Sequence, residues 1–316
     1  MSGRVLSAGY VTLDVTCRVS AFPAWDGRIT ADALSLASGG MAANAAAAAA
    51  VAGAEVHLFG QVAAGSIGQY VLSEVAAHGV DISEVERTSG DAPAVCVILV
   101  DEAGRRAIVS EPFTLDWTRL DRRLPALLRH ETQAALHVDG YHLDGLLERA
   151  PLVREQGGWC SVDLDGRTEL TADTIAQVAA RCDVIVANEA SASLTDREPE
   201  VLARDLAAGG ATVAVTLGAD GALVADRGGG VHAIATPDVD VVDTTGAGDV
   251  FTGNLLAALL AGATPRQAGH HATVAASLAT TAAGARGRLP LPAELAEHHV
   301  TIAALPHHCS LPLEEP

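Results

Sequence analysis

The sequence contains no lysine, and all 20 of its basic residues are arginine. A P-loop needs a lysine that reaches the phosphates of a nucleotide, and protein kinases use a lysine on a strand for the same purpose. An enzyme that forms a Schiff base with its substrate also needs a lysine. The absence of lysine therefore excludes all three kinds of site. Any bound phosphate must be held by backbone N–H groups and by arginine.

Cysteines and long apolar runs are also scarce. The five cysteines are odd in number and widely spaced, which is typical of reduced thiols in the cytoplasm rather than of a disulfide framework. No run reaches the roughly 18 to 20 apolar residues that a membrane span requires, so no membrane association is expected. The cysteines are Cys17, Cys96, Cys160, Cys182 and Cys309.

Basic groups are few beside the acidic ones, and the formal net charge is −19 with a pI near 4.9. An acidic surface repels the phosphates of DNA and RNA, so no nucleic-acid partner is expected. ATP is not excluded, because the N-terminus of a single helix can attract phosphate locally. Aromatic residues make up only 3% of the chain, which leaves few rings to stack on a nucleobase and favours a carbohydrate ligand over a nucleoside.

Strand-like and helix-like runs alternate through most of the 316 residues, which predicts an α/β fold with a central, mostly parallel sheet. A chain of this length buries a large core. The expected core strands are 5–8, 56–59, 134–138, 159–162, 184–187, 212–216 and 223–225. The expected helices are 42–52, 70–77, 124–129, 174–180, 201–207 and 250–260.

Four segments instead alternate polar and apolar residues, namely 14–20, 28–38, 94–100 and 106–110. A period of two residues is typical of half-exposed antiparallel strands. The turn 101–104 joins the last two segments. These segments are expected to form one small sheet outside the main domain, although ordinary edge strands would give the same pattern.

The most informative run is Asp243-Thr244-Thr245-Gly246-Ala247-Gly248-Asp249. Residues 239–242 are expected to end a strand and residues 250–260 to form a helix, so the run lies at a strand-to-helix turn. Small residues let a ligand approach the backbone there, and the free N–H groups at a helix start bind phosphate. Asp249 would be a base that takes a proton from an attacking hydroxyl. An aspartate at a helix start is also favoured by the helix dipole alone.

This run and two others resemble motifs of the ribokinase-like (PfkB) sugar kinases. Gly39-Gly40-Met41-Ala42-Ala43-Asn44 resembles the family's Gly-Gly-x-x-x-Asn segment, and Thr216-Leu217-Gly218-Ala219-Asp220-Gly221 resembles its nucleotide loop. The three motifs occur in the family's order and span nearly the whole chain. The resemblance implies a three-layer, Rossmann-like fold with a small β-sheet lid over the sugar. The kinase domain would be 1–13, 39–90 and 113–316, the lid would be 14–38 and 91–112, and the lid would join two chains into a homodimer.

The resemblance implies an ATP-dependent kinase that transfers the γ-phosphate to a hydroxyl of a small carbohydrate. ATP and Mg²⁺ would be its cofactors, with K⁺ as a further cation. Two alternatives stay open: a nucleoside kinase of the same fold, and a non-catalytic protein that senses a sugar or a nucleotide. A sugar phosphate would require an arginine near the lid, for which Arg28, Arg105 and Arg106 are candidates.

The resemblance also assigns roles to individual residues. Asp249 would be the base, and the N–H groups of Gly246, Ala247 and Gly248 would stabilise the transferring phosphoryl group. The remaining residues fall into three groups: Asn188, Thr216, Gly218, Asp220, Gly221 and Gly248 for the nucleotide; Asp14, Gly39, Gly40, Asn44 and Asp249 for the acceptor; Asp243 and Thr245 for a monovalent cation.

Two segments depart from the family pattern at acidic positions. The family's Gly-x-Asp-x-x-Gly corresponds here to residues 63–68, where Gly65 stands in place of the aspartate. The family's Asn-x-x-Glu begins at Asn188 but has Ser191 in place of the glutamate. The nearby Glu189 need not replace it, because on a helix it would lie about 200° around the axis from position 191. The family's usual magnesium site is therefore altered. Asp163, Asp165 and Arg167 lie just after an expected strand and resemble a family run that ends in arginine, which implies that one of the two acidic groups orders magnesium-bound water.

Two further segments are rich in polar groups. Residues 139–144 follow a core strand and carry hydroxyl, imidazole and carboxylate groups, so they are expected to meet the sugar. The C-terminal region contains the histidine pairs 298–299 and 307–308, which are expected to be a chance feature of a loose tail rather than a metal site. The pair 270–271 is expected to lie on a helix.

Overall fold

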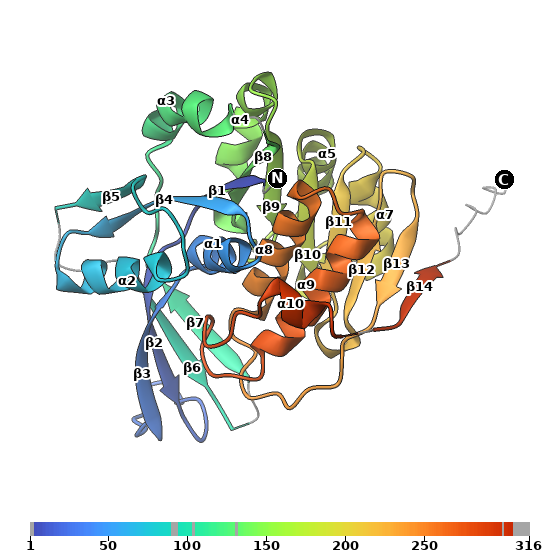
Figure 1. The fold of residues 1–316 in the computed structure, drawn as a ribbon. Coiled ribbons are helices and arrows are strands. Elements are labelled where there is room, and N and C mark those ends of the chain that lie inside the picture. The colour runs from blue at the N-terminus through green and yellow to red at the C-terminus, as the bar shows by residue number, and fades with distance from the viewer. Residues whose placement is uncertain (1–2, 90–93, 103–104, 130–131, 299, 306–316) are drawn as a thin grey trace, which may run out of the picture.

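The computed structural model describes residues 3–89, 94–102, 105–129, 132–298 and 300–305. It has three layers, a large central sheet between two layers of helices, and a second, smaller sheet that projects from this body (Figure 1). This confirms the predicted α/β fold.

The strands are β1 (Arg4–Ala8), β2 (Thr12–Arg18), β3 (Ala33–Gly39), β4 (Glu55–Ala63), β5 (Val85–Thr88), β6 (Ala94–Val100), β7 (Arg106–Ser110), β8 (Ala134–Val138), β9 (Trp159–Asp163), β10 (Val184–Asn188), β11 (Thr212–Thr216), β12 (Ala222–Ala225), β13 (Val231–Ile234) and β14 (Ile302–Leu305). The α-helices are α1 (Met41–Val51), α2 (Ser66–Ala76), α3 (Trp117–Leu128), α4 (Leu143–Glu155), α5 (Ala172–Arg181), α6 (Glu189–Leu194), α7 (Pro199–Ala207), α8 (Ala247–Leu260), α9 (Pro265–Ala279) and α10 (Pro292–Leu295).

The central sheet has the strand order β14-β13-β12-β11-β10-β9-β8-β1-β4-β5. Seven neighbouring strands of this sheet, β5, β4, β1, β8, β9, β10 and β11, are parallel to one another. The pairs β11–β12, β12–β13 and β13–β14 are antiparallel. Because the carboxyl ends of parallel strands lie at one edge of a sheet, the residues that follow β1, β8, β9, β10 and β11 come together there. Ligands of open α/β sheets bind at this edge.

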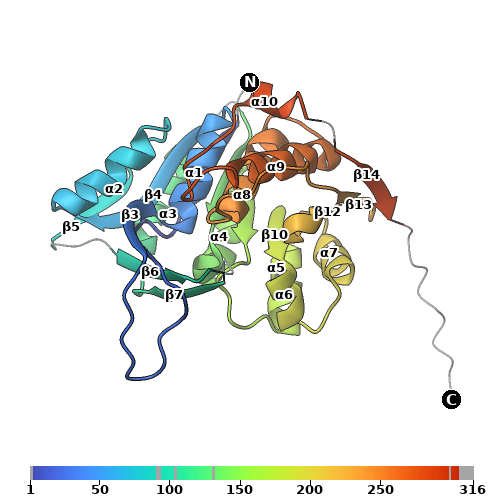
Figure 2. The ribbon, with the colours of Figure 1, turned by 90° about the horizontal axis from the view of Figure 1, so that it is seen from below.

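Two apolar clusters show which helices cover which face of the sheet. One cluster joins the strands to α3, α4, α5 and α7, and the other joins them to α1, α2, α8 and α9 (Figure 2). Helix α1 contains a run of alanines, so α8 can approach it closely. At the closest point a methyl group on Gly253 would lie 2.7 Å from the Ala48 side chain and 2.8 Å from the Ala49 nitrogen. Close packing of these helices fixes the start of α8 against the start of α1.

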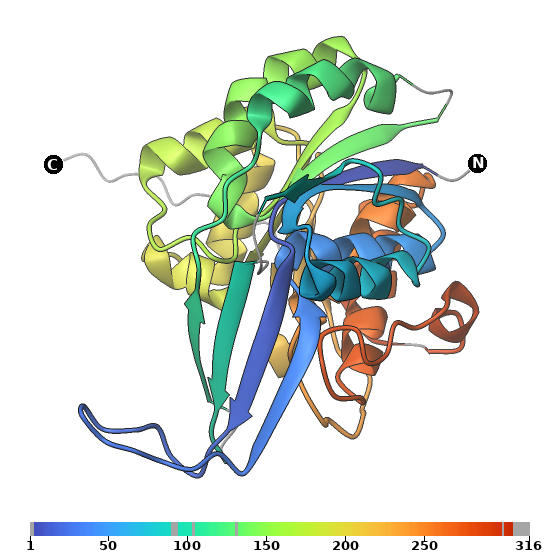
Figure 3. The ribbon, with the colours of Figure 1, turned by 90° about the vertical axis from the view of Figure 1, so that its left-hand side faces the viewer.

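The smaller sheet has the order β3-β2-β6-β7 and extends away from the body of the molecule (Figure 3). It is built from the four segments that alternate polar and apolar residues, as expected, although β3 begins only at Ala33 and residues 28–32 lie outside the strands. The strand pairs β2–β3 and β6–β7 are antiparallel, whereas β2 and β6 are parallel. We call this sheet the lid sheet. The division of the chain into two domains at the boundaries given above stays a prediction.

The expectation that residues 239–242 end a strand is wrong. All four residues are described, and none of them belongs to a strand. The N–H groups of Val242 and Asp243 both donate to the carbonyl oxygen of Thr280, at 2.8 and 3.0 Å, instead of pairing with a strand. Two valines of this segment do not fill the core, since Val241 and Val242 are 61% and 55% exposed, whereas Val239 is half-buried against an apolar cluster. The sequence of this apolar run, which lies beside a cavity, therefore has the same composition as a buried strand.

Several expected features lie outside the described residues: Cys309, His299, His307, His308 and part of the turn 101–104. The described cysteines are all free thiols, and His270 and His271 lie on α9, as expected. In the described part of the chain, no helix is both long enough and apolar enough to cross a membrane.

Candidate active site

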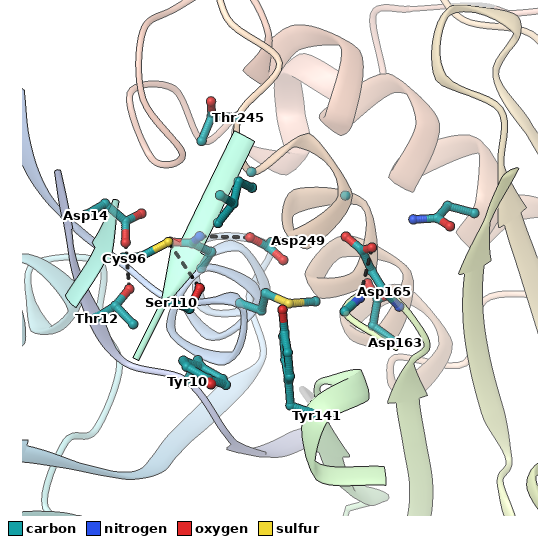
Figure 4. Close-up of a pocket in the computed structure, with 18 of the residues that line it drawn as sticks. Tyr10, Thr12, Asp14, Cys96, Ser110, Tyr141, Asp163, Asp165, Thr245 and Asp249 are labelled. Atoms are coloured by element: carbon teal, nitrogen blue, oxygen red, sulfur yellow. Dashed lines mark hydrogen bonds between the residues drawn. The ribbon is translucent and has the colours of Figure 1, made fainter. Parts of the chain in front are cut away.

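Two adjoining cavities lie at the carboxyl edge of the parallel strands. The first has a volume of about 500 Å³, and it lies between this edge, the start of α1 and the lid sheet (Figure 4). The second has a volume of about 690 Å³ and lies between the 216–221 loop, the 236–241 segment, α8 and α9. Four residues line both cavities, so the two form one continuous site: Arg106, Thr216, Thr244 and Gly248.

The junction of the cavities is the start of α8. Gly246 adopts a left-handed conformation with φ of 75°, and a methyl group there would lie 2.6 to 2.9 Å from Ala285. Only glycine fits such a turn without strain. Among the described residues no side chain caps this helix, although the N–H of Ala247 donates a long bond of 3.3 Å to the carbonyl oxygen of Thr244. The N-terminus of a helix favours an anion. Gly246 and Gly248 line the first cavity, and Ala247 and Gly248 line the second.

Asp249 lies in the first turn of α8 and lines the first cavity. The side-chain amide of Asn44 donates a hydrogen bond of 2.8 Å to its carboxylate (Figure 4). Burial raises the pKa of Asp249 well above its ordinary value, the hydrogen bond from Asn44 opposes this rise, and the nearby Asp163 adds to it. A carboxyl group in this state is suited to accept a proton from a hydroxyl near neutral pH.

Asn44 connects the start of α1 to the rest of the site. Its side chain is 5% exposed and satisfied on both sides, since its oxygen accepts a 2.9 Å hydrogen bond from Arg286. This single amide among the alanines of α1 therefore has two partners, Asp249 and Arg286. Arg286 was not predicted, because it lies 242 residues away in an irregular segment with no motif around it.

Asp14 lies on β2 and faces the first cavity. The hydroxyl of Thr12 donates a 2.7 Å hydrogen bond to its carboxylate. Burial raises the pKa of Asp14, while the bond from Thr12 and the charge of Arg286 oppose the rise. Gly39 on the neighbouring strand leaves the space that the carboxylate occupies, because a methyl group there would overlap it. Gly40 lines the cavity itself, whereas Gly39 lies behind Asp14.

Two tyrosines form an aromatic wall of the first cavity. The rings of Tyr10 and Tyr141 are 4.9 Å apart, and Phe113 packs behind Tyr10 at the same distance. Tyr10 is fixed from both ends, since its N–H donates to Asp139 and its hydroxyl donates to the carbonyl of Glu111. The segment 139–144 thus reaches the cavity through Tyr141, as expected. Sequence composition could not show that the few aromatic residues gather here.

Asp163 and Asp165 line the same cavity, opposite Asp14 (Figure 4). Burial raises the pKa of Asp163 to about 7, and the charge of Asp165 adds to this effect. The hydroxyl of Thr252 on α8 donates a 2.9 Å hydrogen bond to Asp163. Within the described residues no three histidine, cysteine or acidic side chains converge on one metal position. Two carboxylates fit Mg²⁺ nevertheless, because this ion takes one or two protein carboxylates and completes its shell with phosphate and water.

The remaining predicted residues are divided between the site and its surroundings. Thr216, Gly218 and Gly221 line the second cavity, whereas Asp220 is exposed and is not among the residues that line either cavity. Asn188 lines the first cavity and accepts a 2.9 Å hydrogen bond from the N–H of Ser191. Asn188 therefore caps the N-terminus of α6, and Ser191, which is buried, is the third residue of this helix and completes the capping box.

Asp243 lies one turn before α8 and is not among the residues that line either cavity. Its carboxylate instead bonds nearby residues of the chain. Its carboxylate accepts hydrogen bonds from the N–H and hydroxyl of Thr245, at 2.9 and 2.7 Å, and from the N–H of Gly284 at 2.9 Å. Burial favours the protonated acid, but these hydrogen bonds outweigh it and lower the pKa of Asp243. Thr245 itself lines the first cavity.

Comparisons with known proteins agree with this geometry. The chain matches the model of the pfkB family carbohydrate kinases over residues 2–292. It is 31% identical over 288 residues to the ATP-dependent ribose-1-phosphate kinase of Halopiger xanaduensis, a match that covers 90% of this chain and 94% of the relative. It is 30% identical to the aminoimidazole riboside kinase of Salmonella typhimurium, covering 81% and 86%.

Solved structures confirm the fold. The ribokinase of Arabidopsis thaliana in complex with ribose and ATP superimposes with a TM-score of 0.76 at 21% identity, covering 94% of this chain and 98% of that one. The ribokinase of Giardia lamblia gives a TM-score of 0.79 at 19% identity, with the same coverage. The chain therefore belongs to the pfkB family of carbohydrate kinases and is an ATP-dependent kinase that transfers phosphate to a hydroxyl group.

Proposed function

We propose that phosphoryl transfer takes place where the two cavities meet, with the acceptor in the first cavity and ATP in the second. The hydrogen bond between Asn44 and Asp249 carries this proposal, because it joins the acceptor side of the site to a carboxylate at the start of α8. Asp249 takes the proton of the attacking hydroxyl. The N–H groups of residues 246–248 stabilise the charge on the transferring phosphoryl group.

The acceptor is held by polar groups at the floor of the first cavity. Asp14 and Asn44 bind hydroxyl groups, and Gly39 and Gly40 let the sugar approach the backbone. Asp14 can accept hydrogen bonds from two hydroxyls, because its carboxylate is ionised when the pH exceeds its raised pKa. A polyol is therefore a better fit than an apolar alcohol.

The nucleotide is held mainly by backbone and small residues. Thr216, Gly218 and Gly221 flank the base and ribose, with Asp220 at the rim of the loop. Asn188 lies near the phosphates, at the end of β10. Apolar atoms of Val239, of Phe251 and of Ala276 give the base a face to pack against.

Arg106 supplies the positive charge that the absence of lysine leaves to arginine. It extends from β7 of the lid sheet and is the one basic residue among the described residues that line the two cavities. In the part of the chain that the structure describes it forms no ion pair, so its charge is free to interact with phosphate. A guanidinium at the junction would offset negative charge as the phosphoryl group moves.

The cations that the fold implies also find candidate ligands. Asp163 and Asp165 would hold Mg²⁺, partly through water, and the ion would neutralise charge on the phosphates. This pair would take over from the family's acidic positions, which are Gly65 and Ser191 here. Asp243 and Thr245 would contribute to a K⁺ site through carboxylate and backbone oxygens.

The two relatives of known activity act on ribose-1-phosphate and on aminoimidazole riboside, according to their names. A ribose derivative is therefore the first acceptor to test. Nucleoside phosphorylation is a second candidate, and the paired rings of Tyr10 and Tyr141 favour it because a base could stack on them. A purely sensory role is opposed by the bond between Asn44 and Asp249, which serves proton transfer rather than binding alone.

A second copy of the chain would cover the outer face of the lid sheet. Asp14, Cys96 and Ile98 face the first cavity, so the alternate residues of each strand face outward. The outward side chains are apolar, and Leu34, Leu36 and Val109 are 62%, 57% and 70% exposed. Exposed apolar patches of this kind mark interaction surfaces.

We take the lid to comprise residues 14–38 and 91–112. The location that we propose is the cytoplasm, because the described thiols are reduced and the reaction needs ATP.

A coupled assay of ADP release tests the proposed function. The purified protein is supplied with ATP, Mg²⁺ and one acceptor at a time: ribose, ribose-1-phosphate, fructose, adenosine or aminoimidazole riboside. We expect acceptor-dependent ADP release with at least one sugar or sugar phosphate. Release with nucleosides alone would support the second candidate. Binding in calorimetry without any ADP release would contradict a kinase.

A further inference from the structure

We propose that Arg286 is a positioning residue for phosphoryl transfer: it fixes the side-chain amide of Asn44 so that the NH₂ group of this amide faces the carboxylate of Asp249. The proposal rests on the proposed role of Asp249 as the base. Arg286 lies in the irregular segment between α9 and α10, far from every sequence motif described above. It acts through Asn44 and does not line either cavity.

The geometry is specific because a guanidinium group has only hydrogen-bond donors. The Nη1 of Arg286 donates to the Asn44 side-chain oxygen at 2.9 Å, and its Nη2 donates to the backbone oxygen of Ser38 at 2.6 Å. An amide held by a donor on its oxygen must present its NH₂ group on the other side. That group donates to Asp249 at 2.8 Å. Without Arg286 the amide could turn over and present its oxygen to the carboxylate, which would repel it.

The same contacts tie three separate parts of the chain together. Ser38 lies at the end of β3, where the lid sheet joins the main body, and Asn44 lies in the first turn of α1. Two residues before Arg286, the N–H of Gly284 donates to Asp243 at 2.9 Å. The side chain is therefore anchored at both ends, and the donor that reaches Asn44 has a fixed position.

Charge supports the same role. Arg286 has acidic neighbours on several elements: Asp14 on β2, Glu74 on α2 and Asp249 on α8, with the phenol of Tyr70 and the imidazole of His78 nearby on and after α2. Asp249 in turn faces the carboxyl groups of Asp139, Asp163 and Asp165. Burial lowers the pKa of Arg286, but arginine keeps its charge under all ordinary conditions. It is thus the positive group that opposes the surrounding negative charge and favours the ionised base.

The test compares Arg286→Met, Arg286→Lys and a control, Arg288→Met. Arg288 lies in the same segment but bonds Thr281 and pairs with Glu294, away from both cavities. We measure kcat and KM for both substrates across pH, together with the thermal midpoint. For Arg286→Met we expect kcat to fall roughly tenfold or more. The acidic limb of the pH profile should move to higher pH, because Asp249 loses a donor and a nearby positive charge.

Arg286→Lys should recover part of the loss, because an ammonium group keeps the charge and can reach one of the two acceptors. Guanidinium ion added to Arg286→Ala should also restore activity. A variant that loses thermal stability and activity but keeps the wild-type acidic limb would overturn the proposal in favour of a structural role. Unchanged kcat in a folded Arg286→Met would also overturn it. If Asp249→Asn is fully active, the proposed base itself is wrong, which separates the two failures.

Discussion

The neighbours of Asp249 shift its pKa in opposite directions. Burial and the carboxylates of Asp163 and Asp165 favour the protonated acid, whereas the hydrogen bond from Asn44 favours the ionised form. The net pKa lies well above its ordinary value. The base works only when ionised, so kcat/KM should fall as pH decreases through this raised pKa. Bound Mg²⁺ would add positive charge and shift the acidic limb back to lower pH.

Substitution of the base gives the most direct prediction. Asp249→Asn keeps the shape of the side chain but cannot accept the proton, so kcat should fall roughly 10²- to 10⁴-fold. ATP affinity should be kept, because the backbone at the start of α8 is unchanged. Asp173→Asn, at an exposed position on α5, makes the same change of charge and should behave as wild type. Turnover of Asp249→Asn within a few-fold of wild type would exclude this residue as the base.

Asp14 provides a prediction about the acceptor. It is nine-tenths buried, and a site built around a substrate hydroxyl is left with an unpaired group when that hydroxyl is removed. Asp14→Ala should lower kcat/KM for the acceptor about 100-fold or more and change KM for ATP little. Asp32→Ala removes an exposed carboxylate from the same part of the chain and serves as the control. An unchanged kcat/KM for the acceptor would move the sugar site towards Tyr141.

At the scale of elements, the position of α8 depends on its contact with α1. In a helix, replacing glycine by alanine usually stabilises by about 0.5 to 1 kcal/mol. At Gly253 the new methyl group would lie within 2.8 Å of α1 atoms, so the helices must separate. Gly253→Ala should therefore destabilise by roughly 1 to 3 kcal/mol and also lower kcat, because the start of α8 carries Asp249. Ala258→Val, at a half-buried position on the same helix, should do neither. A higher thermal midpoint for Gly253→Ala would contradict this account.

Many elements were predictable from the sequence because periodicity and glycine placement determine them locally. The 13-residue helix α4 was not expected, and of the 15-residue helix α9 only the histidine pair was expected to be helical. The helix after Asp249 and the strands that precede Asn188 and Leu217 lie where the pattern predicts. The short strands β5, β13 and β14 were not predicted, whereas β12, which is equally short, was predicted because its residues are all apolar. Residues 239–242 were predicted wrongly because valines that line a cavity have the composition of a strand.

The candidate site was predictable only where a motif marks it. Asp249 and Asn44 belong to motifs, and their mutual hydrogen bond is consistent with both assignments. Arg106 was one of three candidate arginines near the lid, whereas Arg286 carries no such signal, because its position depends on tertiary packing against Asn44, 242 residues away. Asp220 belongs to a motif and yet lies outside both cavities. A motif therefore predicts which loop approaches a ligand more reliably than which side chain contacts it.

At the scale of the whole molecule, the exposed outer face of the lid sheet predicts the oligomeric state. A charge in the centre of an apolar contact must be desolvated without a partner, which strongly disfavours association. The double variant Leu36→Asp, Val109→Asp should therefore be a monomer in light scattering and sedimentation, whereas we expect wild type to be a dimer. Leu291→Asp introduces a charge at another exposed leucine, 58% exposed, and should leave the dimer intact. A wild-type monomer would contradict the assignment of this face.

The order of residues along the chain separates the two cavities. Apart from Arg106, every described residue that lines the second cavity comes from position 216 or later. The acceptor side of the first cavity is built from Tyr10, Asp14, Asn44, Cys96 and Tyr141, all before position 142. Under the proposed function, the first part of the chain recognises the acceptor and the last part recognises ATP, and helices α1 and α8 bring the two parts together. If so, substitutions in the first part of the chain, other than those of Arg106, can change acceptor preference without touching the residues that line the cavity proposed for ATP.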